Sequence, residues 1–238
     1  MILGDYMNEW SRLEELIGTN KLNRLKQSTV LVLGVGGVGS SAVEHLSRNG
    51  IGKIILVDYD IIDITNLNRQ VMTLHSNVGK RKVEVLKKRI EDISKDIKVS
   101  TICEKITEEN IELLFQEPIH FIIDACDTIR VKKEVIRRCI KYCIPLISCM
   151  GTGNKKDPTK VKIMDIRKTS YDPIAKIIRK MVREEKISKK IMVVTSDEVP
   201  LKKKEVIASN SFVPNTAGML ASYYVVSKLI EGDCYESK

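Results

Sequence analysis

Residues 29–40, TVLVLGVGGVGS, decide the fold of this chain. The first five residues form a short apolar run, which predicts a buried strand. Gly34, Gly36 and Gly39 then fit the pattern G-x-G-x-x-G, and a helical pattern runs from about residue 38 to residue 49. A strand, a glycine-rich turn and a helix in this order are the context in which this pattern binds the phosphates of a nucleotide.

The glycine-rich turn, which also contains Gly37, suits a phosphate for two reasons. Glycines let backbone N–H groups approach the ligand, and the start of the helix adds a partial positive charge. Asp58 ends the next apolar strand, 54–57, at a position 19 residues after Gly39. That spacing suits a carboxylate that accepts hydrogen bonds from a ribose. Because NAD would satisfy these features equally well, they predict an adenine nucleotide and leave the reaction open.

Apolar runs and helical patterns alternate along the rest of the chain. We expect further strands at 99–103, 120–125, 146–149, 161–166 and 191–195, and helices at 80–93, 130–143, from 173 onward and at 214–230. This alternation predicts an α/β fold, a Rossmann-like, doubly wound and mainly parallel sheet with antiparallel strands added in the C-terminal part. We divide the chain into an N-terminal helical segment (1–27), a nucleotide-binding core (28–150) and a C-terminal extension of the same domain (151–238).

Polar and charged residues gather beyond the glycine-rich turn. The loop VDYDIIDITNLNRQ at 57–70 contains Asp60, Asn66 and Arg69, and Lys82 follows at a helix start. A dinucleotide needs few cations beyond the helix dipole, whereas a triphosphate with a charged leaving group needs several. Arg69 and Lys82 are therefore expected to contact the phosphates of ATP, and Asp60 and Asn66 to line the same site.

Asp127 follows the strong strand at 120–125 and is expected at the same crevice. A carboxylate oxygen there suits Mg²⁺, so we predict that Asp127 is the metal ligand. The other interpretation is an N-cap for the helix at 130–143, and one residue can serve both purposes.

Charge is unevenly distributed along the chain. The net charge is +9, of which residues 1–150 contribute +2 and residues 151–238 contribute +7. A basic second part is consistent with an anionic partner, either nucleic acid or a membrane surface, but charge alone favours a solvated, lysine-rich surface. The uncharged run at 206–227 contains only about half of the 20 apolar residues that a membrane span needs, so we expect no transmembrane segment.

Six cysteines occur without any CxxC pair, at positions 103, 126, 139, 143, 149 and 234. This usage is typical of a reduced, intracellular protein and disfavours a structural zinc site. The polar, acidic N-terminus predicts no signal peptide, so we expect a cytoplasmic location.

Four motifs occur in a fixed order: GVGGVGS at 34–40, VDYDIIDITNLNRQ at 57–70, VGKRK at 78–82 and DACDTIRVK at 124–132. Together they resemble the ThiF/MoeB family of ATP-dependent activating enzymes, which are relatives of ubiquitin-activating enzyme. The resemblance covers roughly residues 10–170.

The resemblance implies a role for each matching residue. Asp58 would bind ribose, Asn66, Arg69 and Lys82 would lie at the phosphates, and Asp127 would hold the metal. Arg12 would reach the ATP of a partner subunit, which implies a homodimer.

Within this family the chain looks most like the tRNA threonylcarbamoyladenosine dehydratase branch. The segments RNGIGKIILVDYD, KTSYDPIAKIIRK at 168–180 and SNSFVPNTAGMLAS at 209–222 carry this likeness. The branch implies a tRNA substrate whose threonine carboxylate is activated by ATP and attacked intramolecularly, with net loss of water. Family members that adenylate a ubiquitin-like sulfur carrier often have paired CxxC zinc ligands, and their lack here favours the dehydratase branch.

A basic helix face in the C-terminal part is the expected contact for tRNA phosphates. Its members are Lys176, Arg179, Lys180 and Arg183, and Lys202–Lys204 belong to the same strongly positive part of the chain. An adenylyltransferase for a ubiquitin-like carrier protein, a nucleotide-binding scaffold without chemistry and an NAD-dependent dehydrogenase are the competing interpretations. The resemblance leaves open a sulfur-relay partner of the cysteine desulfurase type, and the choice between AMP and ADP as product.

Overall fold

Seven strands form one sheet in a computed structural model that describes residues 7–201 and 207–232. They are β1 (Thr29–Leu33), β2 (Lys53–Val57), β3 (Lys98–Ile102), β4 (Phe121–Asp124), β5 (Leu146–Cys149), β6 (Val161–Asp165) and β7 (Met192–Ser196). Their order in the sheet is β3-β2-β1-β4-β5-β7-β6. Strand β1 therefore lies near the middle and pairs in parallel with β2 on one side and β4 on the other.

Helices precede, connect and follow these strands. They are α1 (Ser11–Ile17), α2 (Thr19–Gln27), α3 (Gly37–Arg48), α4 (Lys82–Ile93), α5 (Ile129–Lys141), α6 (Pro173–Glu184) and α7 (Phe212–Glu231). Short 3₁₀ turns occur at Ile64–Asn66, His75–Asn77, Ile111–Phe115, Pro158–Lys160 and Ile166–Lys168. The elements expected from the sequence agree with these bounds to within about two residues.

The predicted mainly parallel sheet is confirmed, with one correction in its C-terminal part. Strand β7 runs parallel to β5, and only the edge strand β6 is antiparallel to its neighbour. Both had been expected as antiparallel additions. The register explains the difference. Asp165 at the end of β6 pairs with Met192 at the start of β7, so the segment that contains α6 leaves and re-enters the sheet at the same edge, and β7 runs opposite to β6.

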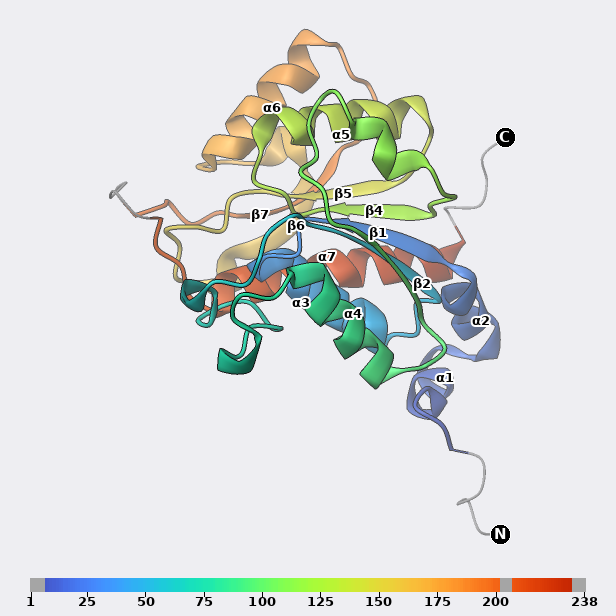
Figure 1. Cartoon of the computed structure of the whole chain (residues 1–238). Coiled ribbons are helices and arrows are strands. Elements are labelled where there is room, and N and C mark those ends of the chain that lie inside the picture. The colour runs from blue at the N-terminus through green and yellow to red at the C-terminus, as the bar shows by residue number, and fades with distance from the viewer. Residues whose placement is uncertain (1–6, 202–206, 233–238) are drawn as a thin grey trace.

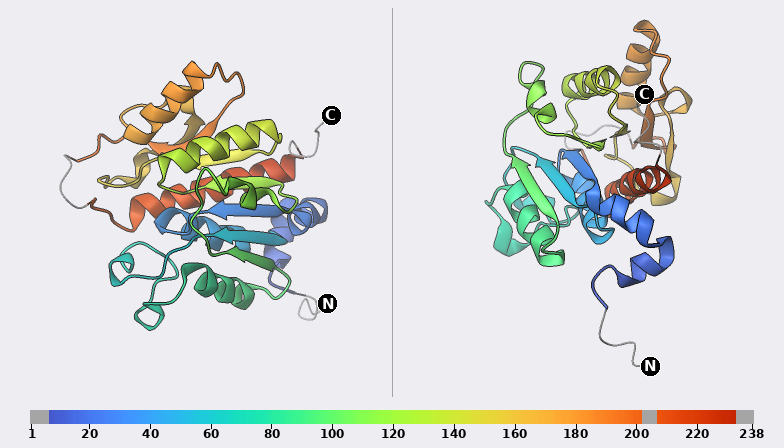
Figure 2. Two further views of the ribbon diagram at one scale, coloured as in Figure 1. Left: turned by 45° about the horizontal axis from the view of Figure 1, so that its top comes forward. Right: turned by 90° about the vertical axis from the view of Figure 1, so that its right-hand side faces the viewer.

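Helices cover both faces of the sheet, α5 and α6 on one face and α3, α4 and α7 on the other (Figures 1 and 2). Alternate side chains of β1 supply both cores. Val30 and Val32 pack with the α3, α4 and α7 side, and Leu31 and Leu33 pack with the α5 side. All four are 3% exposed or less, so burial on both faces explains why this strand is apolar throughout.

The last helix, α7, packs closely against α3. A Cβ atom on Gly218 would lie 2.2 Å from the carbonyl oxygen of Val38 and 2.8 Å from the amide nitrogen of Ala42, so the two backbones touch where a side chain would not fit. Through this contact the C-terminal part of the chain holds the helix that begins at the glycine-rich turn. Among residues 7–201 and 207–232, no helix has the length and apolar character that a membrane crossing requires.

Candidate nucleotide-binding site

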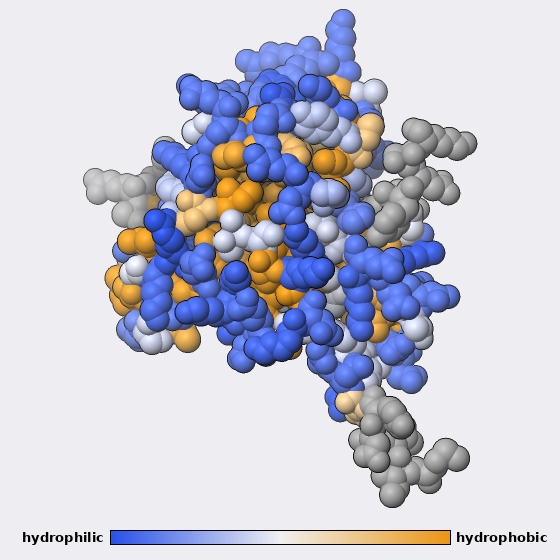
Figure 3. Space-filling view, turned by 45° about the vertical axis from the view of Figure 1, so that its right-hand side comes forward, coloured by the Kyte–Doolittle hydropathy of each residue, from blue (hydrophilic) through white to orange (hydrophobic). Residues whose placement is uncertain are grey.

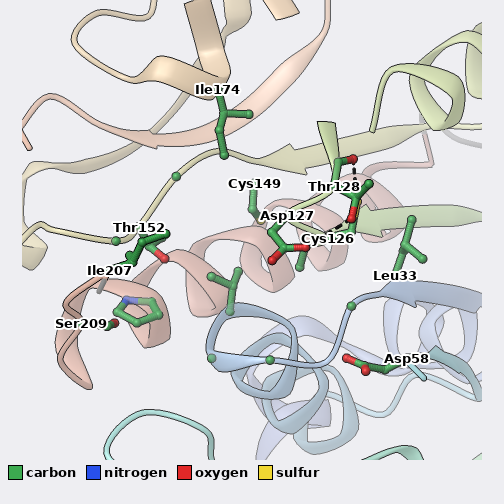
Figure 4. Close-up of a pocket in the computed structure, with 18 of the residues that line it drawn as sticks. Leu33, Asp58, Cys126, Asp127, Thr128, Cys149, Thr152, Ile174, Ile207 and Ser209 are labelled. Carbon is green, nitrogen blue, oxygen red and sulfur yellow. Dashed lines mark hydrogen bonds between the residues drawn. The ribbon is translucent and has the colours of Figure 1, made fainter. Parts of the chain in front are cut away.

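A cavity of about 620 Å³ opens at the carboxyl ends of β1, β2, β4 and β5. One half is lined by the glycine-rich turn, the loop after β2 and the turn after β4. The other half is lined by the segment after β5, the start of α6 and residues 200, 207 and 209. In Figure 4, Asp127 lies between Asp58 on one side and Thr152 and Ser209 on the other. The cavity is at the edge of the sheet where the sequence predicted it.

Each glycine of the turn is explained by a different structural feature. Gly34 has φ +82°, and a Cβ atom there would lie 2.9 Å from the carbonyl oxygen of Ala125. A Cβ atom on Gly39 would lie 1.8 Å from the carbonyl oxygen of Gly34, so Gly39 serves close packing of helix on strand and does not line the cavity. At Gly36 the nearest atom to an added Cβ is Gln70 Nε2, at 3.8 Å. The protein therefore leaves space over Gly36 that a ligand can occupy.

Asp58 is held rigidly at the wall of the cavity. Its Oδ2 accepts a hydrogen bond from the Val35 backbone at 2.8 Å, and its Oδ1 accepts one from the Asp60 backbone at 2.9 Å. Each carboxylate oxygen keeps a further lone pair. Asp58 thus ties the glycine-rich turn to the end of β2 and can still accept a hydrogen bond from a ribose hydroxyl.

Lys82 lies at the start of α4 and its side chain is only 7% exposed. Its Nζ donates to Asp60 Oδ2 at 2.7 Å, and the carboxylate of Asp60 is about half exposed. An ammonium group has three protons, so the pair with Asp60 leaves Lys82 able to donate to a phosphate.

The 3₁₀ turn after β2 fixes the positions of the Asn66 and Arg69 side chains. Asn66 Oδ1 accepts from the Asp63 backbone at 3.0 Å as half of a capping box. Arg69 Nη1 donates to the Thr65 carbonyl at 2.9 Å and to Asn68 Oδ1 at 2.8 Å. These bonds use a single nitrogen of the guanidinium, so the remaining donors of Arg69 are available to a ligand at the cavity.

Asp127 is exposed at the cavity, and the hydroxyl of Thr128 donates to its Oδ1 at 3.4 Å. In the described part of the chain no three His, Cys, Asp or Glu side chains form a metal cluster. Mg²⁺ in nucleotide sites uses one or two carboxylates together with phosphates and water, so a single exposed carboxylate fits that ion. Asp127 is not the side-chain cap of α5, whose N-cap residue is Thr128.

A buried network under the cavity floor was not foreseen from the sequence. Lys132 and Asp124 have fully buried side chains, and Lys132 Nζ donates to Asp124 Oδ2 at 2.7 Å, to Ser148 Oγ at 3.2 Å and to the Cys149 carbonyl at 3.0 Å. Burial opposes the charge of this lysine, but the attraction of Asp124 outweighs it and raises the pKa of Lys132. The only sequence signal was a lysine on the apolar face of the helix.

Cys126 belongs to the same network. Its Sγ donates to Asp124 Oδ1 at 3.0 Å. Burial and the neighbouring Asp124 carboxylate raise the pKa of the Cys126 thiol well above its ordinary value. The thiol therefore stays protonated, which disfavours a nucleophilic role for Cys126.

The second half of the cavity contains a second buried ion pair. Lys155 Nζ lies 2.9 Å from Asp172 Oδ2, and both side chains are 1% exposed. Neither residue is among the site residues that the sequence predicted. Asp172 does cap α6, accepting from the Ala175 backbone at 2.9 Å.

Gln70 is a further cavity residue that the sequence reasoning did not single out. Its side chain is buried, and its Oε1 has no hydrogen-bond partner among the described residues. Its position at the end of the NLNRQ motif was the available signal.

Arg12 does not reach the cavity of its own chain. It is exposed on α1, and the following helix α2 leads into the amino end of β1, opposite to the cavity. It has no hydrogen bond or ion pair to any described residue. Figure 1 shows α1 at the far end of the molecule.

Three of the four cations on the predicted basic face of α6 are exposed, and the fourth is half buried. Lys176 and Arg183 are exposed, and Lys180 lies 3.7 Å from Glu184. Arg179 is half buried and donates to the carbonyl of Thr169 at 2.8 Å and to its hydroxyl. Lys202–Lys204, also expected to contact tRNA, lie outside the described residues. Figure 3 shows one face of the molecule, covered mainly by hydrophilic side chains with apolar groups between them.

The fold and the site together define a Rossmann-like α/β protein with a phosphate-binding turn. A model of the ThiF family matches residues 10–229, and the chain therefore belongs to the ThiF family. This match confirms the family to which the sequence motifs pointed.

Several relatives resemble the chain over nearly its whole length. The tRNA threonylcarbamoyladenosine dehydratase of Bacillus subtilis is 44% identical over 94% of this chain and 96% of its own. The structure of E. coli TcdA, a tRNA N6-threonylcarbamoyladenosine dehydratase, in complex with ATP matches with a TM-score of 0.89 at 30% identity, covering 96% of each chain. Its complex with AMP matches with a TM-score of 0.87 at 31% identity, covering 94% of each chain.

Proposed function

We propose that this protein is an ATP-dependent tRNA threonylcarbamoyladenosine dehydratase. It activates the threonine carboxylate of the modified adenosine beside the anticodon and closes it into the cyclic form. A carboxylate is a poor electrophile and hydroxide is a poor leaving group, so the reaction needs ATP to convert the carboxylate into a mixed anhydride with a phosphate group.

One observation carries the proposal: a single cavity contains both the residues proposed to bind the nucleotide, called here the cradle, and a further half on the other side of Asp127, called here the second chamber. The cradle contains the glycine-rich turn, Asp58, Arg69, Lys82 and Asp127. The second chamber lies beyond Asp127, between the segment after β5 and the start of α6. This arrangement supports a reaction between ATP and an acyl substrate that enters from the far side, and so disfavours simple nucleotide storage.

Each residue of the cradle has a role in this proposal. Asp58 accepts from the ribose, the turn donates backbone N–H groups to the phosphates, and Arg69 and Lys82 offset the charge that develops on the leaving group. Asp127 would hold Mg²⁺, which supplies charge neutralisation at the phosphates when bound. Asn66 and Gln70 supply neutral polar groups at the same wall.

The protein acts as a homodimer in this proposal. Arg12 lies too far from the cavity of its own chain to contact ATP, and contact with the nucleotide of the partner subunit would give it a role. The cytoplasm is the expected location, and tRNA is the macromolecular substrate. A sulfur-relay partner stays a prediction, with no described residue that supports it.

The exposed cations of α6 are the proposed contacts for tRNA phosphates. Lys176, Lys180 and Arg183 extend from the helix whose start lines the second chamber. A tRNA that lies along this helix would bring its modified nucleotide to the mouth of that chamber.

Mass spectrometry of tRNA nucleosides tests the function directly. Purified protein is incubated with tRNA that carries threonylcarbamoyladenosine, ATP and Mg²⁺, and the nucleosides are then analysed. We expect the loss of one water from the modified nucleoside, dependent on ATP. The matched control is Asp127→Asn, which should form little cyclic product from the same tRNA.

The competing function, adenylation of a ubiquitin-like carrier, gives a different result. It predicts ATP–pyrophosphate exchange that depends on a protein with a Gly-Gly tail, and no change in the tRNA. Those two outcomes together would overturn the dehydratase proposal.

A further inference from the structure

Two buried lysines hold the backbone that leaves β5. Lys132 Nζ donates to the carbonyl of Cys149 at 3.0 Å, and Lys155 Nζ donates to the carbonyl of Gly151 at 2.7 Å. Each lysine is paired with a buried aspartate, Asp124 or Asp172. The two carbonyl groups on either side of Met150 are therefore fixed by charge-assisted hydrogen bonds inside the protein.

The Gly151 carbonyl is fixed with particular firmness. Lys155 lies 2.9 Å from Asp172, and Asp172 in turn accepts from the Ala175 backbone at the first turn of α6. A Cβ atom on Gly151 would lie 3.1 Å from Asp172 Oδ2, so the segment also packs directly on this carboxylate. The segment after β5 and the start of α6 thus form one rigid unit on the wall of the second chamber.

The orientation of this carbonyl sets that of the next amide. In a trans peptide the C=O and N–H bonds point in opposite directions, and the described chain contains no cis peptide. Because the Gly151 oxygen points to a buried ammonium group, the Thr152 N–H points the other way, to the more open side. Thr152 is partly exposed and lines the cavity (Figure 4).

The backbone N–H of Thr152 has no hydrogen-bond acceptor among the described residues. Within residues 7–201 and 207–232, the backbone N–H groups of Gly151, Thr152 and Gly153 make no hydrogen bond, although the neighbouring Met150 and Asn154 amides do. Unpaired backbone N–H groups at the wall of a cavity can donate hydrogen bonds to a bound ligand.

We propose that the Thr152 N–H donates a hydrogen bond to the carbonyl oxygen of the substrate's acyl group, on which negative charge develops. We further propose that Lys155 is the positioning residue that fixes the direction of this N–H. This inference rests on the proposed dehydratase function. It assigns the second chamber to the threonine carboxyl group, on the side of Asp127 away from Asp58.

The donor acts in the second of two steps. First, a carboxylate oxygen attacks a phosphorus atom of ATP and displaces pyrophosphate or ADP. Then a carbamoyl atom of the same nucleotide attacks the activated carbonyl carbon, whose π electrons move onto its oxygen. The C–O bond to the phosphorus group breaks as the carbonyl re-forms, AMP or phosphate leaves, and a carbamoyl N–H proton passes to solvent. Negative charge develops on the carbonyl oxygen only in this second step, where an aligned amide stabilises it.

The substitution Lys155→Met tests the assignment, since it removes the ammonium group that holds the Gly151 carbonyl. We expect the first-turnover cleavage of ATP to be nearly unchanged and the rate of cyclisation to fall about 10- to 100-fold. The activated carboxyl then has time to react with water, so more than one ATP is consumed per cyclic nucleoside. ATP cleavage and cyclic product are measured in the same samples, together with KM for ATP and for tRNA.

Two further variants separate this effect from a loss of folding. Lys155→Met alone leaves the Asp172 charge buried without a partner, whereas K155M/D172N removes both charges and retains an N-cap for α6. Lys156→Met is the matched control, because it removes the same charge from an exposed side chain one residue further on. We expect uncoupling in K155M/D172N and full coupling in K156M.

The ratio of ATP consumed to cyclic product tests whether Lys155 positions the Thr152 N–H. A distorted pocket would lower both rates together, so an unchanged ratio in K155M/D172N would overturn the role of Lys155 and Thr152 even if the overall rate fell. A wild-type protein that forms no cyclic nucleoside would instead overturn the proposed function itself.

Discussion

Lys82 Nζ lies 2.7 Å from Asp60 Oδ2 at the wall of the cavity. Because the lysine side chain is buried and the aspartate is half exposed, the lysine is held in place before any nucleotide arrives. Preorganised cations of this kind need little rearrangement during the reaction, which is why they stabilise developing charge effectively.

Replacing Lys82 with Met should therefore remove most of the activity. We expect the ATP-dependent rate to fall by about 10²–10³. Steady-state kinetics with varied ATP measure this change. Lys80→Met, which removes an exposed charge two residues earlier, is the control and should stay within a few-fold of wild type. Equal losses in K80M and K82M would contradict a specific phosphate contact.

The glycine-rich turn offers a pair of matched substitutions, Gly36→Ala and Gly39→Ala. An added methyl at Gly36 meets no protein atom closer than 3.8 Å, so the melting temperature should be unchanged while ATP binding weakens. At Gly39 the methyl would lie 1.8 Å from a carbonyl oxygen, which should destabilise the fold by about 1–3 kcal/mol.

Thermal unfolding and ATP titration of both variants check this expectation. A G36A protein that binds ATP as tightly as wild type would mean that no phosphate lies over Gly36.

The sequence was sufficient for the sheet and for the set of residues that meet at the cavity, for a physical reason. The strand Thr29–Leu33 is buried on both faces and is therefore apolar throughout, and the glycine-rich turn is a local motif whose geometry depends on its own residues. Asp58 and Asp127 follow strands that flank β1, so strand order alone brings them together.

The second chamber could not be read from the sequence in the same way. Lys155 and Asp172 are 17 residues apart and meet only through tertiary folding. In sequence Lys155 has the appearance of a turn lysine, and a buried lysine differs from an exposed one only in its surroundings. Arg179 was assigned to the exposed basic face, yet Thr169 in the preceding loop accepts hydrogen bonds from its guanidinium group.

The buried pair of Lys132 and Asp124 predicts a particular dependence of stability on pH. Burial disfavours the charge of Lys132, but Asp124 outweighs it, so the pKa of Lys132 in the folded protein is raised above 10.5. A raised pKa stabilises the folded state below the unfolded value and loses that contribution as the pH rises through the folded value.

Lys132→Met should accordingly lower the free energy of unfolding by about 3–5 kcal/mol, because it leaves Asp124 buried without a partner. The difference from wild type should be constant over roughly pH 6 to 9 and decrease only above the ordinary pKa of lysine. Chemical denaturation across this range measures it. A difference that already disappears near neutral pH would show that the pair is not charged in the folded protein.

Binding of tRNA should depend on salt through the exposed face of α6. We expect K176Q/K180Q/R183Q to weaken binding and to reduce the slope of log K against log salt by about two to three, since each phosphate contact contributes slightly less than one. Arg179→Gln should act mainly on the Thr169 contact and less on the slope. The control K21Q/K26Q/K88Q removes three exposed charges from α2 and α4 and should retain the slope. Equal slopes in all variants would remove α6 from the tRNA surface.

The location of Arg12 leads to an experiment that detects sharing of sites between subunits. Arg12 lies on the helix that precedes the amino end of β1, through α2, whereas Asp127 follows the carboxyl end of β4. If Arg12 contacts the nucleotide of the partner subunit, R12A and D127N are each inactive alone, but a mixed dimer contains one site with an intact Asp127 and an intact Arg12 from the other chain.

Random exchange of subunits should then restore about a quarter of the wild-type activity, since half of the dimers are mixed and each has one working site. The rate of cyclic nucleoside formation after co-refolding measures this gain, and R12A mixed with K82M should behave alike. No recovery in either mixture, with dimers present by light scattering, would mean that Arg12 does not act across the interface.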